Sequence, residues 1–239
     1  GANRGIGLEL ARQYAARGWN VIATSRHAAG DPALAALNAI AAAHPQVVLE
    51  RIDVTSTAMI RAVAEKYRDQ PIDVLINNAA AVSDTFAADL KRANTAFEKI
   101  DFDAARRDFD VNALGPMRMA QAFAPNVELS RQKKIANITS LAGSFGRGLP
   151  GGIAMNYSAS KAALNKYSVL LAYDLKPKGV LVGLFEPIFV ASKRDMDARL
   201  RAEAPIGREV AKLIRQIDAL SPATSGKIVN FSTGKIDPF

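Results

Sequence analysis

Short apolar runs rich in Val and Ile alternate along this chain with segments that have the spacing of helices. The runs that we expect to form strands are residues 20–26, 47–53, 72–78, 133–140, 179–185 and 226–231. Helices are expected between them, at residues 6–17, 33–43, 104–127 and 155–175, and through most of 192–219. Asp31 followed by Pro32 should cap the helix at 33–43, and Ser56 should cap a further helix after the strand 47–53. Strands that are apolar on both faces are typical of a parallel sheet between two layers of helices. The order therefore predicts an α/β, doubly wound, mostly parallel sheet with helices on both faces.

The composition limits the kinds of chemistry that the chain can support. Its 239 residues contain no linker, repeat or low-complexity tract, so we expect a single domain over residues 1–239. The absence of Cys excludes disulfides, thiolate catalysis and Cys-ligated zinc. The two histidines, His27 and His44, lie in polar surroundings between the predicted elements. They leave little material for a metal site or a Ser-His-Asp triad, and no metal is expected.

The net charge of +8 raises the question of an anionic partner. The Lys and Arg residues are scattered, and the densest groups, Arg106-Arg107 and Lys133-Lys134, are short and lack interleaved aromatic residues. We interpret them as solvated faces and expect no nucleic-acid partner. No apolar run approaches the about 20 residues that a membrane helix needs, and no signal peptide is visible. A cytoplasmic location is therefore expected.

The chain opens with the glycine-rich stretch GANRGIG, which runs directly into a predicted helix. Glycines at positions 1, 5 and 7 let the backbone turn tightly and approach a pyrophosphate, which the N-terminus of the following helix attracts. A turn of this kind normally follows a strand. We therefore expect that a first strand of about six to eight residues precedes Gly1 and is missing from the chain as given.

The end of the strand 20–26 indicates which dinucleotide would bind. In dinucleotide-binding domains, an acid at this point accepts hydrogen bonds from a ribose hydroxyl. Here the strand ends Ala-Thr-Ser-Arg, without an acid. Arg26 and Arg4 could instead bind a 2′-phosphate through their guanidinium groups. NADP(H) is accordingly favoured over NAD(H), and the alternative is two solvated arginines.

Polar residues follow or interrupt three further predicted elements. Asp53 follows the strand 47–53 and could accept from an adenine amino group, or simply stabilise a turn. Asn77-Asn78-Ala79-Ala80 ends the strand 72–78, where small residues would let a cofactor lie against the backbone. Asn112 lies within a helix, which is unfavourable for Asn and needs a reason; a kink at Pro116 would be a structural one.

Three side chains have the properties of a proton-transfer site. Ser140 ends the strand 133–140, and ligands of open α/β sheets lie beyond the carboxyl ends of the strands. The alternative is that Ser140 only caps a helix or turn. Tyr157 and Lys161 are four residues apart in YSASK, so they lie on one face of a helix. A nearby ammonium favours the phenolate, and we expect Lys161 to lower the pKa of Tyr157. A tyrosine tuned in this way can act as a general acid or base.

Taken in order, these motifs resemble the short-chain dehydrogenase/reductase family, in its compact single-domain branch. The resemblance rests on GANRGIG, Asp53-Val54, NNAA, VNALGP, ITS and YSASK, which follow one another in family order along essentially the whole chain. The two ends of the chain, GANRGIGLELARQYAARGWNVIATSR and SGKIVNF with GKIDPF, are closest to C-factor-like and sniffer-like carbonyl reductases.

The resemblance implies a Rossmann-like fold and an NAD(P)-dependent oxidoreductase that transfers a hydride between a nicotinamide and a carbonyl or alcohol. Tyr157 would be the general acid/base, Lys161 would lower its pKa and hold the nicotinamide ribose, Ser140 would bind the substrate oxygen, and Asn112 would support a water relay. Further residues would contact the cofactor: Gly1, Asn3, Arg4, Gly5, Ile6, Gly7, Arg26, Asp53, Val54, Asn78, Ala79, Ala80, Pro187, Ile188 and Val190.

The chain departs from the family pattern at the loop after the strand 179–185. Ile188 stands where the family has a glycine, directly after Pro187, and Glu186 adds a carboxylate nearby. The family also has Gly where this chain has Ala80. If the loop needs a positive φ at position 188, isoleucine is strained; if the loop is rebuilt, isoleucine adds apolar contact. This departure keeps open a second function, that of an NADP-binding regulatory or scaffold protein with little turnover.

The substrate and the assembly are less fully specified. Five residues around the predicted site indicate an apolar pocket that would suit an aldehyde, a ketone or a hydrophobic alcohol: Phe145, Leu149, Met155, Phe189 and Met196. In the family, the helix that carries Tyr157 often packs against its counterpart in another subunit. Here one apolar stripe of this helix should meet the sheet: Leu164, Tyr167, Leu171 and Leu175. A second stripe on the far side leads us to expect a homodimer or homotetramer; it consists of Ala163, Val169, Leu170 and Tyr173.

Overall fold

A computed structural model describes residues 1–83, 100–146, 154–187 and 205–239. Its main helices are α1 (Gly5–Ala16), α2 (Ala35–Ala43), α3 (Thr57–Lys66), α4 (Phe102–Phe109), α5 (Gly115–Glu128), α6 (Met155–Leu175) and α8 (Ile206–Asp218). Its strands are β1 (Val21–Ser25), β2 (Val47–Arg51), β3 (Val74–Asn77), β4 (Lys134–Ile138), β5 (Leu181–Glu186), β6 (Ile228–Asn230) and β7 (Ile236–Asp237). Short 3-10 turns are η1 (Pro32–Leu34), η4 (Leu141–Gly143) and η5 (Lys176–Lys178).

The strands form two sheets of almost entirely parallel strands. β1 pairs with β2, and the five-stranded sheet has the order β3-β4-β5-β6-β7, with only β7 antiparallel. The backbone N–H of Ala2 donates to the carbonyl of Thr24 at 2.7 Å, and Asn78 donates to the carbonyl of Gly1 at 3.1 Å. Residues 1 and 2 therefore lie between the ends of β1 and β3. The strand expected upstream of Gly1 stays a prediction.

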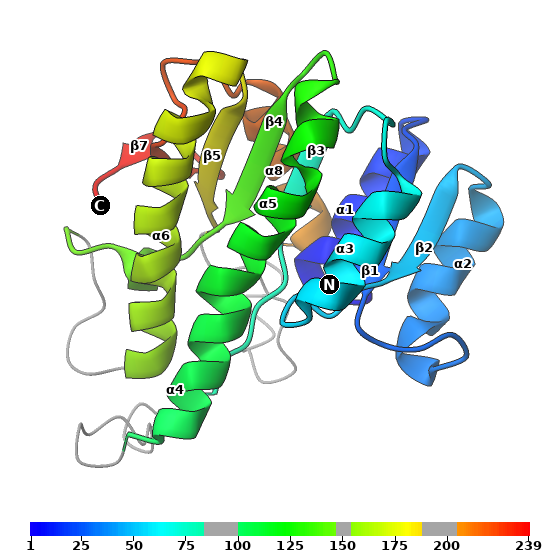
Figure 1. The fold of residues 1–239 in the computed structure, drawn as a ribbon, viewed down its shortest axis with the longest axis horizontal. Coiled ribbons are helices and arrows are strands. Elements are labelled where there is room, and N and C mark those ends of the chain that lie inside the picture. The colour runs from blue at the N-terminus through cyan, green and yellow to red at the C-terminus, as the bar shows by residue number, and fades with distance from the viewer. Residues whose placement is uncertain (84–99, 147–153, 188–204) are drawn as a thin grey trace.

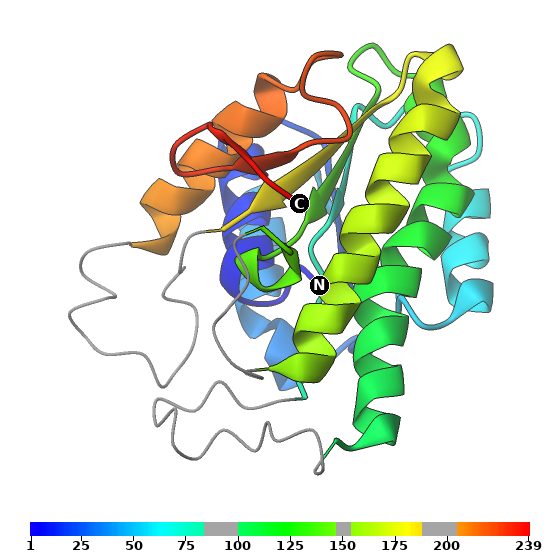
Figure 2. The same cartoon turned by 90° about the vertical axis from the view of Figure 1, so that its left-hand side faces the viewer.

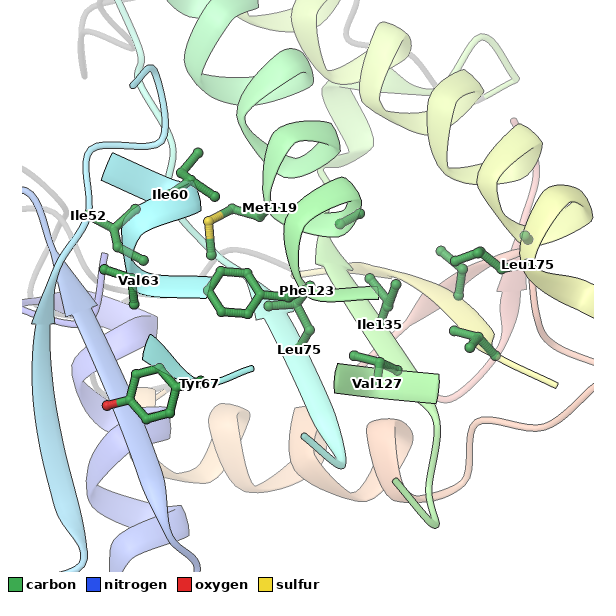
Figure 3. Packing of buried hydrophobic residues seen from close by; sticks show 14 residues of the cluster. Ile52, Ile60, Val63, Tyr67, Leu75, Met119, Phe123, Val127, Ile135 and Leu175 are labelled. Atoms are coloured by element: carbon green, nitrogen blue, oxygen red, sulfur yellow. The ribbon is translucent and has the colours of Figure 1, made fainter. Parts of the chain in front are cut away.

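Helices cover both faces of the sheet, as the alternation of elements predicts. α1 and α8 lie on one face and α3, α5 and α6 on the other (Figures 1 and 2). A core on the α3–α5 side contains Ile60, Met119, Phe123 and Ile135 (Figure 3). A second core packs Phe185 and other apolar residues of the sheet against α1 and α8. The fold is thus the doubly wound, Rossmann-like arrangement expected from the sequence.

Local capping explains where several helices begin. The side chain of Ser56 accepts from the N–H of Met59 at 3.3 Å and caps α3. Asp31 accepts from the N–H of Ala33 at 2.8 Å and starts the turn before α2, with Pro32 in its first position. Both caps confirm the predicted starts, because a side-chain oxygen there satisfies an N–H that has no partner within the helix.

The segment predicted as one helix over 104–127 is interrupted in the structure. A π-helical turn, Asp110–Leu114, joins α4 to α5. The irregularity therefore lies before Pro116 rather than being a kink at it. Pro116 occupies the first turn of α5, where a residue without an N–H is tolerated. The wider π turn contains Asn112, which gives the buried asparagine its structural reason.

Two further comparisons with the sequence prediction concern the C-terminal part. Within the predicted helical stretch 192–219, α8 covers residues 206–218, and residues 188–204 lie outside the described part of the chain. β7 was not predicted, because two residues give no periodicity.

Among the described residues, no helix has both the length and the apolar character required to cross a membrane. A cytoplasmic location stays a prediction.

Candidate active site

The carboxyl ends of β4 and β5 meet the N-terminal half of α6. Ser140 follows β4 and caps η4, its side chain accepting from the N–H of Ala142 at 3.2 Å. Tyr157 and Lys161 lie one turn apart in α6. A hydrogen bond between the side chains of Ser140 and Tyr157 brings the strand end and the helix together. The structure therefore groups three of the four predicted catalytic residues.

Close backbone contact between η4 and α6 sets the spacing of this group. A Cβ atom placed on Gly143 would lie 2.6 Å from the carbonyl carbon of Lys161 and 2.8 Å from the nitrogen of Ala162. Neither atom can move without shifting the helix, so only glycine allows this approach. The sequence analysis did not single out Gly143, although the glycine directly after the Ser140 turn was a usable signal.

Buried side-chain amides hold α6 against the same strand. Asn165 receives a hydrogen bond from Thr139 and donates to the carbonyl of Gly143 at 2.9 Å. Two residues before Thr139, Asn137 of β4 donates to the hydroxyl oxygen of Ser168 at 2.8 Å. These polar groups are almost fully buried, so losing a partner would leave a desolvated group at a cost of about 1–3 kcal/mol. They fix the position of α6 along the sheet.

Lys161 carries the most deeply buried ammonium group of the site. The residue is 2% exposed, and its Nζ donates to the carbonyl of Ile138 at 2.8 Å. The same Nζ lies 5.7 Å from the centre of the Tyr157 ring. Burial disfavours the charged form and lowers the pKa of Lys161 from 10.5 to about 8. Lys161 is therefore still largely protonated at neutral pH, but at a cost in folding free energy.

The phenol of Tyr157 differs from the sequence-based expectation. Loss of solvent around the half-buried phenol raises its pKa, the hydrogen bond with Ser140 lowers it, and the charge of Asp108 raises it further. The net pKa is raised, whereas we expected Lys161 to lower it. The physical reason is that desolvation of the phenolate is the largest contribution in this cofactor-free site. Tyr157 accordingly keeps its proton at neutral pH.

Asn112 is fully buried in the π turn and connects three segments. Its Nδ2 donates to the carbonyl of Ala81 at 2.8 Å and to the Oγ of Ser160 at 2.9 Å, and its Oδ1 accepts from the N–H of Ala81 at 2.7 Å. Ser160 in turn donates to the carbonyl of Tyr157 at 2.7 Å. Both amide hydrogens of Asn112 are thus in use, and the side chain braces α6 against the chain that follows β3.

The glycine-rich start of the chain forms a tight loop at the N-terminus of α1. Gly5 has a φ of 57°, in the left-handed region that favours glycine. A Cβ on Gly7 would lie 2.1 Å from the carbonyl oxygen of Gly1 and 2.6 Å from Nδ2 of Asn78. Asn3 makes a long contact of 3.5 Å to the carbonyl of Ala33, Arg4 is the extended residue before α1, and Ile6 packs partly into the core. The helix N-terminus and the bare backbone fit a pyrophosphate.

Arginine side chains gather beside this loop. Arg4 and Arg26 both lie close to Gly1. Arg26 and Arg51 act on Asp53, whose pKa is lowered mainly by a hydrogen bond from the N–H of Thr55 and also by these two cations. The Nε of Arg51 donates to the carbonyl of Arg26 at 3.3 Å. The guanidinium groups suit a phosphate that carries two charges, and Arg51 is a member that the sequence analysis missed.

The remaining predicted cofactor residues line the ends of β2 and β3. Asp53 accepts from the N–H and hydroxyl of Thr55, at 2.9 and 2.7 Å, so it has the turn-stabilising role that was the alternative. Val54 contacts α5 closely, because a Cβ on Gly115 would lie 2.9 Å from it. Ala79 is partly buried and Ala80 is exposed after β3. Their contacts with a cofactor stay predictions.

Part of the predicted site lies outside the described residues. Pro187 is described and partly buried, whereas Ile188, Val190, Leu149, Phe189 and Met196 lie outside. Phe145 is 88% exposed beside η4. Glu186, which precedes Pro187, is buried and accepts from Asn230 at 3.1 Å. Within the described ranges, no three His, Asp or Glu side chains are grouped so that they could hold a metal ion.

Comparisons with known proteins agree on one family. The short chain dehydrogenase family matches residues 1–204. The C-signal protein of Myxococcus xanthus is 34% identical over 172 residues, which cover 72% of this chain and 96% of that protein. The structure resembles the NADPH-bound carbonyl reductase from chicken fatty liver, with a TM-score of 0.87, 25% identity and coverage of 100% and 96%. The carbonyl reductase Sniffer of D. melanogaster has the same fold, with a TM-score of 0.81, 22% identity and coverage of 100% and 97%. These findings confirm the resemblance predicted from the motifs.

The burial of Lys161 leads to a prediction about stability. Its pKa is lower in the folded than in the unfolded chain, so the unfolded state binds more protons between about pH 8 and 10.5. The free energy of unfolding contributed by Lys161 therefore rises with pH across this window. Lys161→Met should increase the free energy of unfolding at pH 7 by roughly 1–3 kcal/mol and remove this rise, as measured by urea denaturation.

The exposed Lys166→Met on the same helix is the matched control and should change neither quantity. Comparing each variant with the unchanged protein cancels the contribution of Lys134, whose pKa burial also lowers. A clear loss of stability in Lys161→Met at pH 7 would mean that the bond from Nζ to the carbonyl of Ile138 outweighs the burial of the charge.

Proposed function

The chain belongs to the short-chain dehydrogenase family, and we propose that it is an NADP(H)-dependent carbonyl reductase, working reversibly, with Tyr157 as the general acid/base. Membership supports a hydride-transfer oxidoreductase; the cofactor preference and the catalytic residues are our proposal. The observation that carries the proposal is the hydrogen bond between Ser140 and Tyr157 with the buried ammonium of Lys161 close by. A protein that only binds a nucleotide has no use for this arrangement.

The proposed roles follow from the state of each side chain. When bound, the cofactor supplies or accepts the hydride. Tyr157 keeps its proton at neutral pH because burial raises its pKa, so it can donate that proton to the oxygen of a carbonyl substrate. Ser140 shares a hydrogen bond with the phenol and would orient the same oxygen. In the reverse direction, Tyr157 would accept the proton of an alcohol.

Lys161 and Asn112 would assist this proton transfer without contacting the substrate. The ammonium of Lys161 lies 5.7 Å from the Tyr157 ring, and its positive charge would stabilise the phenolate that forms as the proton leaves. The amide hydrogens of Asn112 are not available to a relay water, because Nδ2 donates them to the carbonyl of Ala81 and to the Oγ of Ser160. We infer that Asn112 supports the relay by holding the π turn and α6 in place.

NADP(H) is the proposed cofactor, held by the glycine-rich loop and the arginines beside it. Arg4 and Arg26 lie at this loop, and Arg51 approaches Arg26. Guanidinium groups bind phosphate through paired charge-assisted hydrogen bonds, which would favour a 2′-phosphate over a ribose hydroxyl. The carbonyl reductase from chicken fatty liver was solved with NADPH, which supports the same choice.

The substrate is proposed to be an aldehyde, a ketone or the corresponding hydrophobic alcohol. Phe145 and Met155, on either side of residues 147–153, would supply part of an apolar wall. The alternative of a regulatory NADP-binding protein depended on Ile188, which lies outside the described residues, so no described feature favours it. NADPH oxidation measured with a panel of aldehydes and ketones decides between the two, because the alternative predicts little or no turnover with any of them.

We further propose that the protein assembles through α6. Leu164 and Leu175 face the core, as predicted, but Leu170 is 50% exposed and Tyr173 is 72% exposed. Tyr167, which we placed on the sheet side, also lies at the surface. A row of large apolar side chains on one helix is a typical interface between subunits. This face supports a homodimer or a homotetramer. We also propose that each chain forms a single domain.

Tyr157→Phe tests the proposed general acid. The substitution removes only the phenolic oxygen, so turnover with a reactive aldehyde should fall by ~10² or more, the scale that general acid catalysis supplies. NADPH binding, measured by fluorescence titration, should stay within about twofold, since the ring is retained. Tyr167→Phe removes the same atom elsewhere on α6 and serves as the control. Full activity of Tyr157→Phe would exclude Tyr157 as the general acid.

Arg26→Ala tests the proposed cofactor preference. Losing a charge-assisted contact to phosphate should raise the KM for NADPH by roughly tenfold or more, while the KM for NADH changes little. Arg61→Ala, an exposed arginine on α3, is the control for net charge. Equal effects of Arg26→Ala on both cofactors would contradict the assignment of NADP(H).

Leu170→Glu tests the proposed assembly. A charge in the centre of the α6 face should dissociate the assembly to monomers at micromolar concentration, as measured by light scattering. Val48→Glu places the same charge on an exposed apolar residue of β2, at the other edge of the molecule (Figure 1), and should leave the mass unchanged. A clean monomer mass for the unsubstituted protein would overturn the proposal directly.

A further inference from the structure

Asp108 is a buried carboxylate on α4, the helix that packs against α6, which carries Tyr157. It lies on α4, is 1% exposed, and is the only buried charge on that helix; Asp103, Arg106 and Arg107 are exposed. A carboxylate is rarely buried this deeply unless it is paired with a cation or fully hydrogen-bonded.

The surroundings of Asp108 satisfy only one of its two oxygens. Its Oδ2 accepts from the N–H of Ser83 at 3.1 Å and from the hydroxyl of Ser83 at 2.8 Å. Its Oδ1 is buried and has no hydrogen-bond partner among the described residues. No described salt bridge includes Asp108. The structure thus keeps a partly unsatisfied negative charge in its interior, a cost that needs a compensating function.

The position of Asp108 in the helix connects it to the site. Asp108 lies one turn before Asn112, so both residues project from the same side of the helical segment. Asn112 braces Ala81 and Ser160, and Asp108 braces Ser83 two residues further along the same segment. α4 and the π turn both pack against α6, which carries Tyr157.

From this geometry, we propose that Asp108 is a positioning residue that acts through Tyr157: its fixed negative charge holds the phenol in the proton-donating form and extends carbonyl reduction to higher pH. This inference rests on the proposed function. The electrostatics agree with it, because the charge of Asp108 raises the pKa of Tyr157. It acts in the same direction as the burial of the phenol and against the hydrogen bond with Ser140, which lowers this pKa.

The other charged groups on elements that pack against α6 do not repeat this role. On α6 itself, Lys161 is the buried charge, and Lys166 and Asp174 are exposed. On η5, which also packs against α6, Lys176 and Lys178 are exposed. In the π turn, Asp110 is paired with Arg118 at 2.6 Å. On β5, the buried Glu186 accepts from Asn230. η4 contains no charged residue. Asp108 is therefore the carboxylate whose removal should change the titration of Tyr157 most.

The experiment is a titration of Tyr157 by near-ultraviolet tyrosinate absorbance, over the pH range in which circular dichroism shows an intact fold. The chain has five tyrosines, and the component that Tyr157→Phe removes belongs to Tyr157. In Asp108→Asn, which keeps an oxygen for Ser83 and loses the charge, this component should ionise at lower pH. Asp110→Asn removes the same charge two residues away and should leave it unchanged. Because absorbance needs no turnover, the result does not depend on whether the protein is a reductase.

The pH profile of carbonyl reduction supplies the functional half of the test. Lys161 loses its proton first, near pH 8, so the limb that reports Tyr157 lies at higher pH. This second limb should move to lower pH in Asp108→Asn, so activity on it drops roughly three- to tenfold relative to the unsubstituted protein. Asp108→Glu keeps the charge and should restore the unsubstituted profile. If Asp108→Asn does not fold, Asp108→Thr removes the charge with a smaller side chain that retains a hydroxyl for Ser83. Identical Tyr157 titrations in the charged and neutral variants would overturn the inference.

Discussion

The structure depends on a layer of buried polar side chains between the sheet and α6. Asn77 donates to Asn137 and Asn137 donates to Ser168, each at 2.8 Å, in a chain that ends on the helix. Each of these buried groups loses its hydrogen bond if α6 slides or rotates, and an unsatisfied buried group costs more than a well-made bond gains. Apolar packing would tolerate several positions of the helix, whereas this layer tolerates one. That single position puts Tyr157 beside Ser140.

The π turn plays the corresponding part on the other side of α6. One wider turn lets the helical segment 102–128 continue while Asn112 enters the buried interior and bonds Ala81 and Ser160. Two hydrogen bonds hold the chain that follows β3: Ala81 bonds Asn112 of the π turn, and Ser83 bonds Asp108 of α4. A π turn is less stable than regular helix, and its presence here matches the tendency of such turns to occur at functional sites. The π turn thus joins the chain after β3 to α6, the helix that carries Tyr157.

The fold and the central residues of the site were predictable because their signals are local. Alternating periodicity identified the elements, side-chain oxygens before α2 and α3 identified their starts, and the spacing of Tyr157 and Lys161 placed them on one helix face. Asp108 was missed because, in AARRDFD, it looks like the solvated charges around it, and only tertiary packing makes it buried. Asn165 was missed because only tertiary packing buries it, whereas Gly143 was missed although its place just after Ser140 was a usable signal. The pKa of Tyr157 was predicted in the wrong direction because a sequence shows the neighbouring cation but not the loss of solvent.

Burial sets the protonation states of Tyr157 and Lys161, the proposed catalytic pair, before any ligand binds. It lowers the pKa of Lys161 to about 8 and raises that of Tyr157, so at neutral pH the phenol is protonated and the ammonium is largely charged. Reduction of a carbonyl can start from this state, because the proton donor and the cation that stabilises its phenolate are both in place. Oxidation of an alcohol first requires the phenol to ionise. The contacts that bury α6 therefore set both the geometry and the protonation of the site, and the same burial makes Lys161 costly for stability.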